Sequence, residues 1–170
     1  VERFFGVALA RELAMAGRQA DLMVANNVLA HVPDINDFVA GFAVLLKKEG
    51  VATFEFPHLL RMVQECQFDT AYHEHYSYLS LGTVQRIFAG QGLQVFDVAS
   101  LPTHGGSLRV FAQRQDSGRQ PVQPAVAALL AEEAAAGLQA PAFYAGFQAQ
   151  ADQPTVQGAI EAAEIGRAHV

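Results

Sequence analysis

The sequence predicts an α/β fold: a mostly parallel sheet with one antiparallel strand, helices on both faces, and a helical tail at the C-terminus. Three observations lead to this prediction. Short apolar runs that suit buried strands alternate with segments whose apolar residues recur at helical spacing. The connections between these segments are short, as in the βαβ unit of a parallel sheet. One connection is only a tight turn, which favours an antiparallel pair of strands.

The first half of the chain reads as helix, strand, helix and strand. We expect a helix over residues 6–17, followed by a short strand over 21–26 that is buried on both faces. A second helix is expected over 34–48. The run Lys47-Lys48-Glu49-Gly50 is expected to close it, with cations at the negative end of the helix dipole and a glycine cap. The next strand is expected over 51–56.

The second half continues the pattern. A helix is expected over 81–90, and a strand over 93–98. The turn Thr103–Gly106 then leads into a strand over 108–113, which we expect to be antiparallel and near the end of the sheet. A further Ala-rich helix is expected over 125–139, after a linker over 115–124 that contains Ser, Gly and two Pro.

Composition excludes several classes of protein. The formal net charge is −6 and no run of Lys or Arg occurs, which argues against nucleic acid or an anionic membrane as partner. The single cysteine, Cys66, allows neither an internal disulfide nor a zinc site of several thiolates in this stretch. No apolar run approaches the ~18 residues of a membrane span. We therefore expect a cytoplasmic enzyme.

The densest group of reactive side chains lies at residues 72–78, which contain two imidazoles, one carboxylate, three phenols and one hydroxyl. A metal site is not expected, because the pattern is not the helical H-E-x-x-H motif and lacks a third fixed ligand. These side chains could instead hold a long loop in place through hydrogen bonds. Acid–base chemistry is favoured, because histidine titrates near neutral pH and a neighbouring carboxylate can orient it.

Other polar residues follow the first two expected strands. Asn26, Asn27 and His31 come after one strand, and His58 follows the other. In doubly wound sheets ligands lie beyond the carboxyl ends of the strands, so these residues are placed where a ligand would be. A lone histidine at such a position is more often structural.

The turn before the last strand is a further candidate. His104, Gly105, Gly106 and Ser107 offer backbone N–H groups, and Arg109 adds a cation two residues on. This combination suits a phosphate group. A simple glycine-containing turn explains the same residues equally well.

The stretch from Asn26 to Arg109 resembles the nucleotide-sugar C-methyltransferases, which have the Rossmann-like class I S-adenosylmethionine fold and act on deoxy-keto-sugars. Three segments carry the resemblance in the same order. They are Asn-Val-Leu-Ala-His-Val (27–32), Phe-Asp-Thr-Ala-Tyr-His-Glu-His-Tyr-Ser-Tyr-Leu (68–79) and Thr-His-Gly-Gly-Ser-Leu-Arg (103–109). The Tyr-His-Glu-His segment is close to diagnostic of the family.

The resemblance implies a thymidine-diphosphate-linked (dTDP) keto-sugar as substrate and S-adenosyl-L-methionine as cofactor, with methyl transfer to the carbon beside the ketone. His75 corresponds to the general base, Tyr72 and Glu74 to residues that position the sugar and stabilise the enolate, and His31 to a residue of the same pocket. Asn26 and Asn27 fall on the cofactor side. The implied substrate-binding residues are His58, His104, Gly105, Gly106, Ser107 and Arg109.

The resemblance also implies that this chain is a truncated fragment. Family members carry upstream a cysteine-rich zinc domain and a Gly-rich loop that binds the cofactor, and neither occurs here, so zinc belongs only to a missing N-terminal domain. Residues 1–114 would then be the C-terminal part of a methyltransferase domain, and 115–164 a linker and the start of a C-terminal α/β domain. Residues 165–170 read as a sequencing or cloning artefact.

Three alternatives stay open. The 115–164 tail could begin a second domain or pack back on the sheet. The protein could be a class I methyltransferase that transfers to oxygen or nitrogen of another small molecule, although the Tyr-His-Glu-His loop is not needed to methylate an acidic hydroxyl. It could also be a non-catalytic α/β ligand-binding module.

Overall fold

A computed structural model describes residues 3–153 of the chain. Its sheet has four strands in the order β1-β2-β4-β3. Their bounds are Ala20–Asn26 (β1), Leu46–Pro57 (β2), Leu93–Leu101 (β3) and Ser107–Arg114 (β4). The α-helices are Val7–Met15 (α1), Ile35–Leu45 (α2), Leu59–Gln64 (α3), Leu81–Gly90 (α4), Pro124–Ala135 (α5) and Phe147–Ala151 (α6). The predicted α/β class and the order of these main elements are confirmed.

The sheet is less parallel than the sequence predicted. β1 and β2 pair in parallel, whereas β4 lies between β2 and β3 and is antiparallel to both. Three strands therefore run in one direction, but a single pairing is parallel. The turn at Thr103–Gly105 inserts β4 between β2 and β3, so the antiparallel strand is internal and β3 forms the edge.

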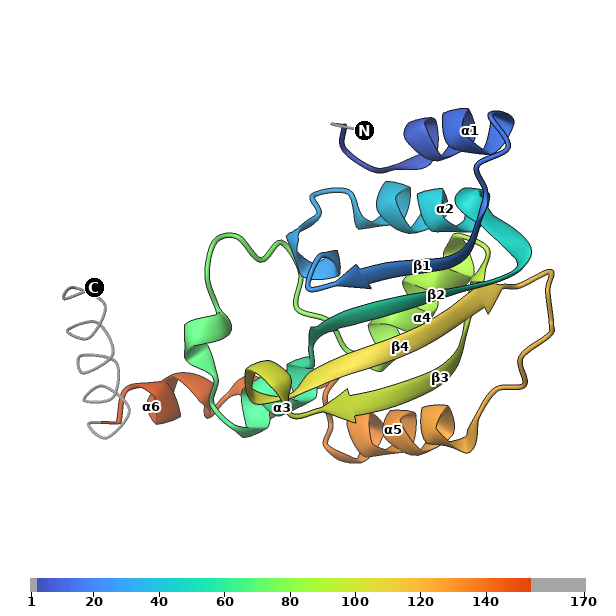
Figure 1. Ribbon diagram of the computed structural model, residues 1–170. Helices are drawn as coiled ribbons and strands as arrows, with labels where there is room; N and C mark the ends of the chain where they lie inside the picture. The colour runs from blue at the N-terminus through green and yellow to red at the C-terminus, as the bar shows by residue number, and fades with distance from the viewer. Residues whose placement is uncertain (1–2, 154–170) are drawn as a thin grey trace.

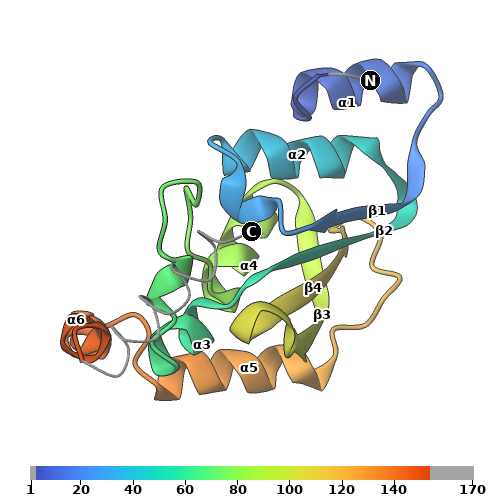
Figure 2. The same ribbon diagram turned by 60° about the vertical axis from the view of Figure 1, so that its left-hand side comes forward.

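The prediction of helices on both faces of the sheet is wrong for the described residues. Phe54 of β2 contacts Phe42 of α2 and Phe88 of α4, at ring-centroid distances of 4.5 and 4.7 Å. A strand residue points to one face, so α2 and α4 share that face. In Figure 1, α4 lies behind the strands, and α1 stacks on α2 rather than on the sheet. Figure 2 shows the same stacking from another side.

The core forms between this face and the helices that cover it. Most of its fully buried side chains come from α2, α4 and the inward positions of β2, β3 and β4. They include Val39, Phe54, Phe56, Val84, Phe88, Leu93, Leu108 and Val110. On β1 the side chains of Leu22 and Val24 stay 60% and 58% exposed. The apolar run of β1, predicted to be buried on both faces, is therefore covered on one.

The second helix ends three residues earlier than predicted. α2 stops at Leu45, and Lys47-Lys48-Glu49-Gly50 belongs to β2. Lys47 forms an ion pair with Asp21 at 2.7 Å instead of facing a helix end. Gly50 does not cap a helix. A Cβ atom there would lie 2.8 Å from the carbonyl oxygen of Ala20, so glycine is needed for the close approach of β1 and β2.

The C-terminal tail packs back on the sheet through α5. Val126 and Leu129 are buried in the main core, and α5 lies against β3 and α4. The linker is tied down by Gln113, whose carboxamide bonds both the N–H and the carbonyl of Gln120. The division at residue 114 stays a prediction, and the proposed artefact at 165–170 lies outside the described residues. Within residues 3–153, no helix is long and apolar enough to cross a membrane.

Candidate active site

The carboxyl ends of β1 and β2 lie together and position the first candidate residues. Asn27 follows β1 in the left-handed region (φ 54°), and its N–H donates to the carbonyl of Glu55 on β2 at 2.8 Å. A short 3-10 turn over Leu29–His31 comes next and brings His31 to this edge of the sheet. The side chains of Asn26 and Asn27 are exposed there.

A cluster of three rings forms where the 65–80 segment meets this edge. The ring of His75 lies 4.6 Å from that of His31 and 4.3 Å from that of Tyr72, measured between centroids. In Figure 1 this segment is the green loop beside the tip of β1. The N–H of Tyr76 donates to the carbonyl of Ala30 at 2.8 Å, which holds the loop against the His31 turn. Sequence-distant residues that were expected to share a pocket are thus brought together.

Both histidines of the cluster are held in the same way. Nδ1 of His31 contacts the carbonyl of Glu74 at 3.1 Å, and Nδ1 of His75 contacts the carbonyl of Thr70 at 2.9 Å. A carbonyl can only accept, so Nδ1 must donate in each case. In the neutral ring the proton is then on Nδ1, and Nε2 is left with a free lone pair. Each histidine is therefore set up to take a proton at Nε2.

Glu74 enters the cluster through its backbone rather than its carboxylate. Its carbonyl orients His31, and its side chain is exposed. Main-chain oxygens orient both histidines, so the orienting role expected of a carboxylate is not found for Glu74. Its role toward the sugar stays a prediction.

Arg109 is engaged by a buried carboxylate. Its Nη2 and Nε donate to one oxygen of Glu55 at 2.6 and 3.2 Å, and the hydroxyl of Thr103 donates to the other oxygen at 3.2 Å. The Glu55 side chain is nearly buried. An anionic ligand at Arg109 would therefore have to share the guanidinium with Glu55. The position of Glu55 at the end of its strand was the signal that could have predicted this pair.

Several of the expected substrate residues line one pocket of about 350 Å³ between α3, the end of β3 and the start of β4. Its lining includes His58, Arg61, Gly105, Gly106 and Ser107. His104 lies in the adjoining 3-10 turn. Both glycines have positive φ, and a Cβ atom on Gly106 would lie 3.0 Å from Cβ of Arg61. The Gly-Gly pair is thus explained by the turn itself, whatever it binds.

His58 has a buried partner that the sequence analysis missed. Its side chain is 2% exposed, and its Nε2 lies 2.8 Å from a carboxylate oxygen of Glu133 on α5. Glu133 continues the buried stripe of Val126 and Leu129 at helical spacing. A carboxylate at an apolar stripe position was the signal that could have found it. Among the described residues, no three His, Cys, Asp or Glu side chains gather where they could hold a metal ion.

Comparison with known families fits this architecture. A family model described as "Methyltransferase domain" matches residues 3–98, more than half of the chain. This chain belongs to the methyltransferase domain family. A second model, described as "C-methyltransferase C-terminal domain", matches residues 102–160. The C-methyltransferase NovU of Streptomyces niveus is 38% identical over 143 residues, which cover 84% of this chain and 34% of that protein. The methyltransferase chain thus spans about a third of the length of this relative.

Two solved structures resemble about half of this chain. One is a S-adenosylmethionine-dependent methyltransferase from Clostridium acetobutylicum, with 10% identity and a TM-score of 0.45 over 56% of this chain and 58% of that one. Another is the magnesium protoporphyrin IX methyltransferase from Synechocystis with bound SAH, with 15% identity and a TM-score of 0.43 over 56% of this chain and 45% of that one.

Proposed function

We propose that this chain is the proton-transfer part of a S-adenosylmethionine-dependent C-methyltransferase that acts on a dTDP-linked deoxy-keto-sugar. The observation that carries the proposal is the cluster of His31, Tyr72 and His75, with Nε2 of both histidines free to accept a proton. The similarity to the C-methyltransferase NovU supports transfer to carbon. The full-length enzyme is the protein that contains this chain together with the segments that NovU has and the chain lacks.

The chemistry of methyl transfer to carbon explains why such a cluster is needed. A C–H bond beside a ketone is a weak acid, and its carbon becomes a nucleophile only after the proton leaves. Nε2 of His75 takes that proton, the C–H electron pair becomes the enolate, and the phenol of Tyr72 donates to the developing oxyanion. His31 lies against His75 and can take the proton onward. The enolate carbon would then take the methyl group as the methyl–sulfur bond breaks, and the electron pair of that bond would stay on the sulfur of the departing thioether.

The cofactor requirement is met only in part by the residues present. When bound, S-adenosylmethionine supplies an electrophilic methyl group on a sulfonium. The exposed carboxamides of Asn26 and Asn27 can both donate and accept, so they suit its polar groups at the carboxyl end of β1. No G-x-G sequence follows any strand of this chain, so the remainder of the cofactor site is assigned to segments outside it.

The nucleotide part of the substrate is assigned to the pocket beside the Gly105-Gly106 turn. His58, Ser107 and the backbone of the turn line it, with His104 in the adjoining turn. Arg61 borders the same pocket and is paired with Glu132, and Arg109 is paired with Glu55. A diphosphate here would find one bordering cation and backbone donors.

The full-length enzyme tests this proposal when it is incubated with S-adenosylmethionine carrying a ¹³C-methyl group and a dTDP-deoxy-keto-sugar. The ¹³C chemical shift of the product separates a methyl on carbon from one on oxygen or nitrogen. We expect the methyl on the carbon beside the ketone. A methyl on oxygen or nitrogen would favour a different small-molecule methyltransferase, and no transfer to any keto-sugar would favour a non-catalytic ligand-binding module.

A further inference from the structure

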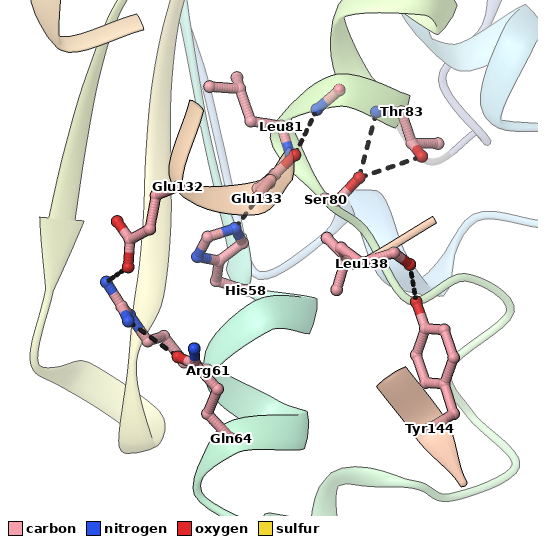
Figure 3. A network of polar contacts seen from close by, with 11 residues as sticks. His58, Arg61, Gln64, Ser80, Leu81, Thr83, Glu132, Glu133, Leu138 and Tyr144 are labelled. Carbon is pink, nitrogen blue, oxygen red and sulfur yellow. Dashed lines mark hydrogen bonds and ion pairs between the residues drawn. The ribbon is translucent and has the colours of Figure 1, made fainter. Parts of the chain in front are cut away.

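The carboxylate of Glu133 on α5 is buried and accepts three hydrogen bonds, one from His58 and two from the first amides of α4 (Figure 3). One oxygen contacts Nε2 of His58 at 2.8 Å and the N–H of Leu81 at 2.6 Å. The other oxygen accepts from the N–H of Gly82 at 3.0 Å. The Glu133 residue is only 6% exposed, so these bonds replace the water that a free carboxylate would bind.

The partners of Glu133 stand at the two ends of one segment. His58 directly precedes α3, and Leu81 and Gly82 open α4. The residues between them, 59–80, include the whole of the 72–78 loop. A β-bridge between His58 and Leu79 and a bond from the N–H of Leu59 to the carbonyl of Leu79 (3.0 Å) bring the two ends side by side. One carboxylate therefore fixes both ends of the segment that carries the ring cluster.

The bonds to α4 are the ones that a helix start leaves open. Ser80 is the N-cap of α4, and its side chain accepts from the N–H of Thr83 at 3.2 Å. The first two amides, those of Leu81 and Gly82, have no partner within the helix. Glu133 accepts from both, and a negative charge at a helix N-terminus is favourable. Ser80 and Glu133 together thus satisfy the start of the helix.

The charge of Glu133 is maintained by these contacts. Burial raises the pKa of this carboxyl, but the bonds from His58, Gly82 and Leu81 outweigh burial, so the pKa lies below its usual value. The group is therefore ionised at neutral pH. A buried carboxylate needs its donors, so His58, Leu81 and Gly82 cannot move apart without leaving the charge unpaired.

We propose that Glu133 is a positioning residue for the methyl-transfer site, which holds the ends of the 59–80 segment so that Tyr72 and His75 keep their places beside His31. This inference rests on the proposed function. The C-terminal domain model matches the region that contains α5, and the methyltransferase domain model matches the region that contains Tyr72 and His75. The inference therefore gives α5 a role in arranging residues of the methyltransferase domain. The C-terminal region then acts on catalysis without touching the substrate.

Glu133→Gln in the full-length enzyme tests the inference, because glutamine keeps the volume but replaces one acceptor oxygen by a donor that faces other donors. The matched control is Glu12→Gln on α1, which removes the exposed ion pair with Arg3. The readout is exchange of the α-hydrogen of the keto-sugar with D₂O, expressed per site that binds S-adenosylmethionine by calorimetry. Counting sites in this way removes any effect of partial unfolding.

We expect Glu133→Gln to lower the turnover number for α-exchange by ~10-fold or more, on the scale of a misplaced catalytic group. Amide hydrogen exchange at His75 and Tyr76 should rise in the same variant, and Glu12→Gln should match the parent in both measurements. If glutamine prevents folding, Glu133→Asp is measured in its place. Aspartate keeps the negative charge, but its side chain is one methylene shorter and cannot reach the same donors.

A folded position-133 variant with the parent's exchange rate per site would overturn the inference and leave the proposed function intact. An equal rise of amide exchange throughout the protein would overturn it as well, since that is the signature of a purely structural role. A parent enzyme with no α-exchange at all would overturn the proposed function and, with it, this inference.

Discussion

At the scale of single residues, the proposed proton transfer depends on which ring nitrogen of His31 and His75 is free to accept a proton. Backbone carbonyls of Thr70 and Glu74 fix His75 and His31 by Nδ1, so the basic nitrogen of each ring is Nε2. The sequence predicted which residues meet, since Tyr72, His75 and His31 do form one cluster. It did not predict that main-chain oxygens orient the rings, because carbonyl positions depend on the local path of the loop.

Tyr72→Phe tests the donor to the oxyanion. The change removes the phenol hydroxyl while keeping the ring against His75, so methyl transfer by the full-length enzyme should fall by ~10²–10³ in kcat. Tyr76→Phe is the matched control, because Tyr76 lies in the same loop and its side chain is 63% exposed. Steady-state rates with the keto-sugar provide the measurement. Equal losses in both variants would mean that Tyr72 is not a specific donor.

The acid stability of the chain should depend on Glu133. Its pKa is lowered in the folded state, so its contribution to the free energy of unfolding is complete above its ordinary pKa near 4.5 and is lost as the pH falls through the lower folded value. Urea unfolding of this chain across that acid range should therefore show a smaller loss of stability in Glu133→Gln than in the parent. Identical pH dependence in the two proteins would show that the carboxylate is not preferentially ionised in the fold.

At the scale of elements, the sequence predicted existence and order better than boundaries and faces. The run Lys47-Lys48-Glu49-Gly50 suits a helix end, and its membership of β2 depends on the approach of Gly50 to Ala20, a contact that no local pattern contains. Likewise, the apolar stripe of α5 can be recognised in the sequence. Glu133 can be buried within that stripe because it pairs with His58, which lies 75 residues away in the sequence. The contacts that were missed are those between residues far apart in sequence.

Gly50→Ala tests the close approach of β1 and β2. The new Cβ atom would lie 2.8 Å from the backbone oxygen of Ala20, so the strands would have to shift, and the free energy of unfolding should fall by ~1–3 kcal/mol. Gly90→Ala is the control, because nothing lies within 4 Å of its Cβ position near the end of α4. That variant should be neutral or more stable by up to ~1 kcal/mol. Denaturant midpoints of both variants provide the comparison, and equal midpoints would contradict the packing account.

At the scale of the whole molecule, the sheet presents one face to helices and leaves Leu22 and Val24 of β1 exposed on the other. The residues proposed for proton transfer lie on this chain, whereas no G-x-G loop that could admit the cofactor follows any of the four described strands. The chain should therefore bind S-adenosylmethionine weakly or not at all, and the full-length enzyme should bind it well. Isothermal titration calorimetry on the chain and on the full-length enzyme measures the two affinities. Micromolar binding by this chain alone would mean that the cofactor site lies within it and has been assigned wrongly.

The central claim is that His75 removes the proton beside the ketone. The most direct measurement is exchange of that hydrogen with D₂O, catalysed by the full-length enzyme in the presence of an unreactive cofactor analogue, which isolates the proton-transfer step from methylation. His75→Ala should lower the exchange rate by ~10²–10⁴, with cofactor affinity nearly unchanged. His73→Ala, two positions away in the same loop, should exchange at the parent's rate. If His75→Ala still exchanged the hydrogen as fast as the parent, the claim would be contradicted and His31 would be the next residue to test as the base.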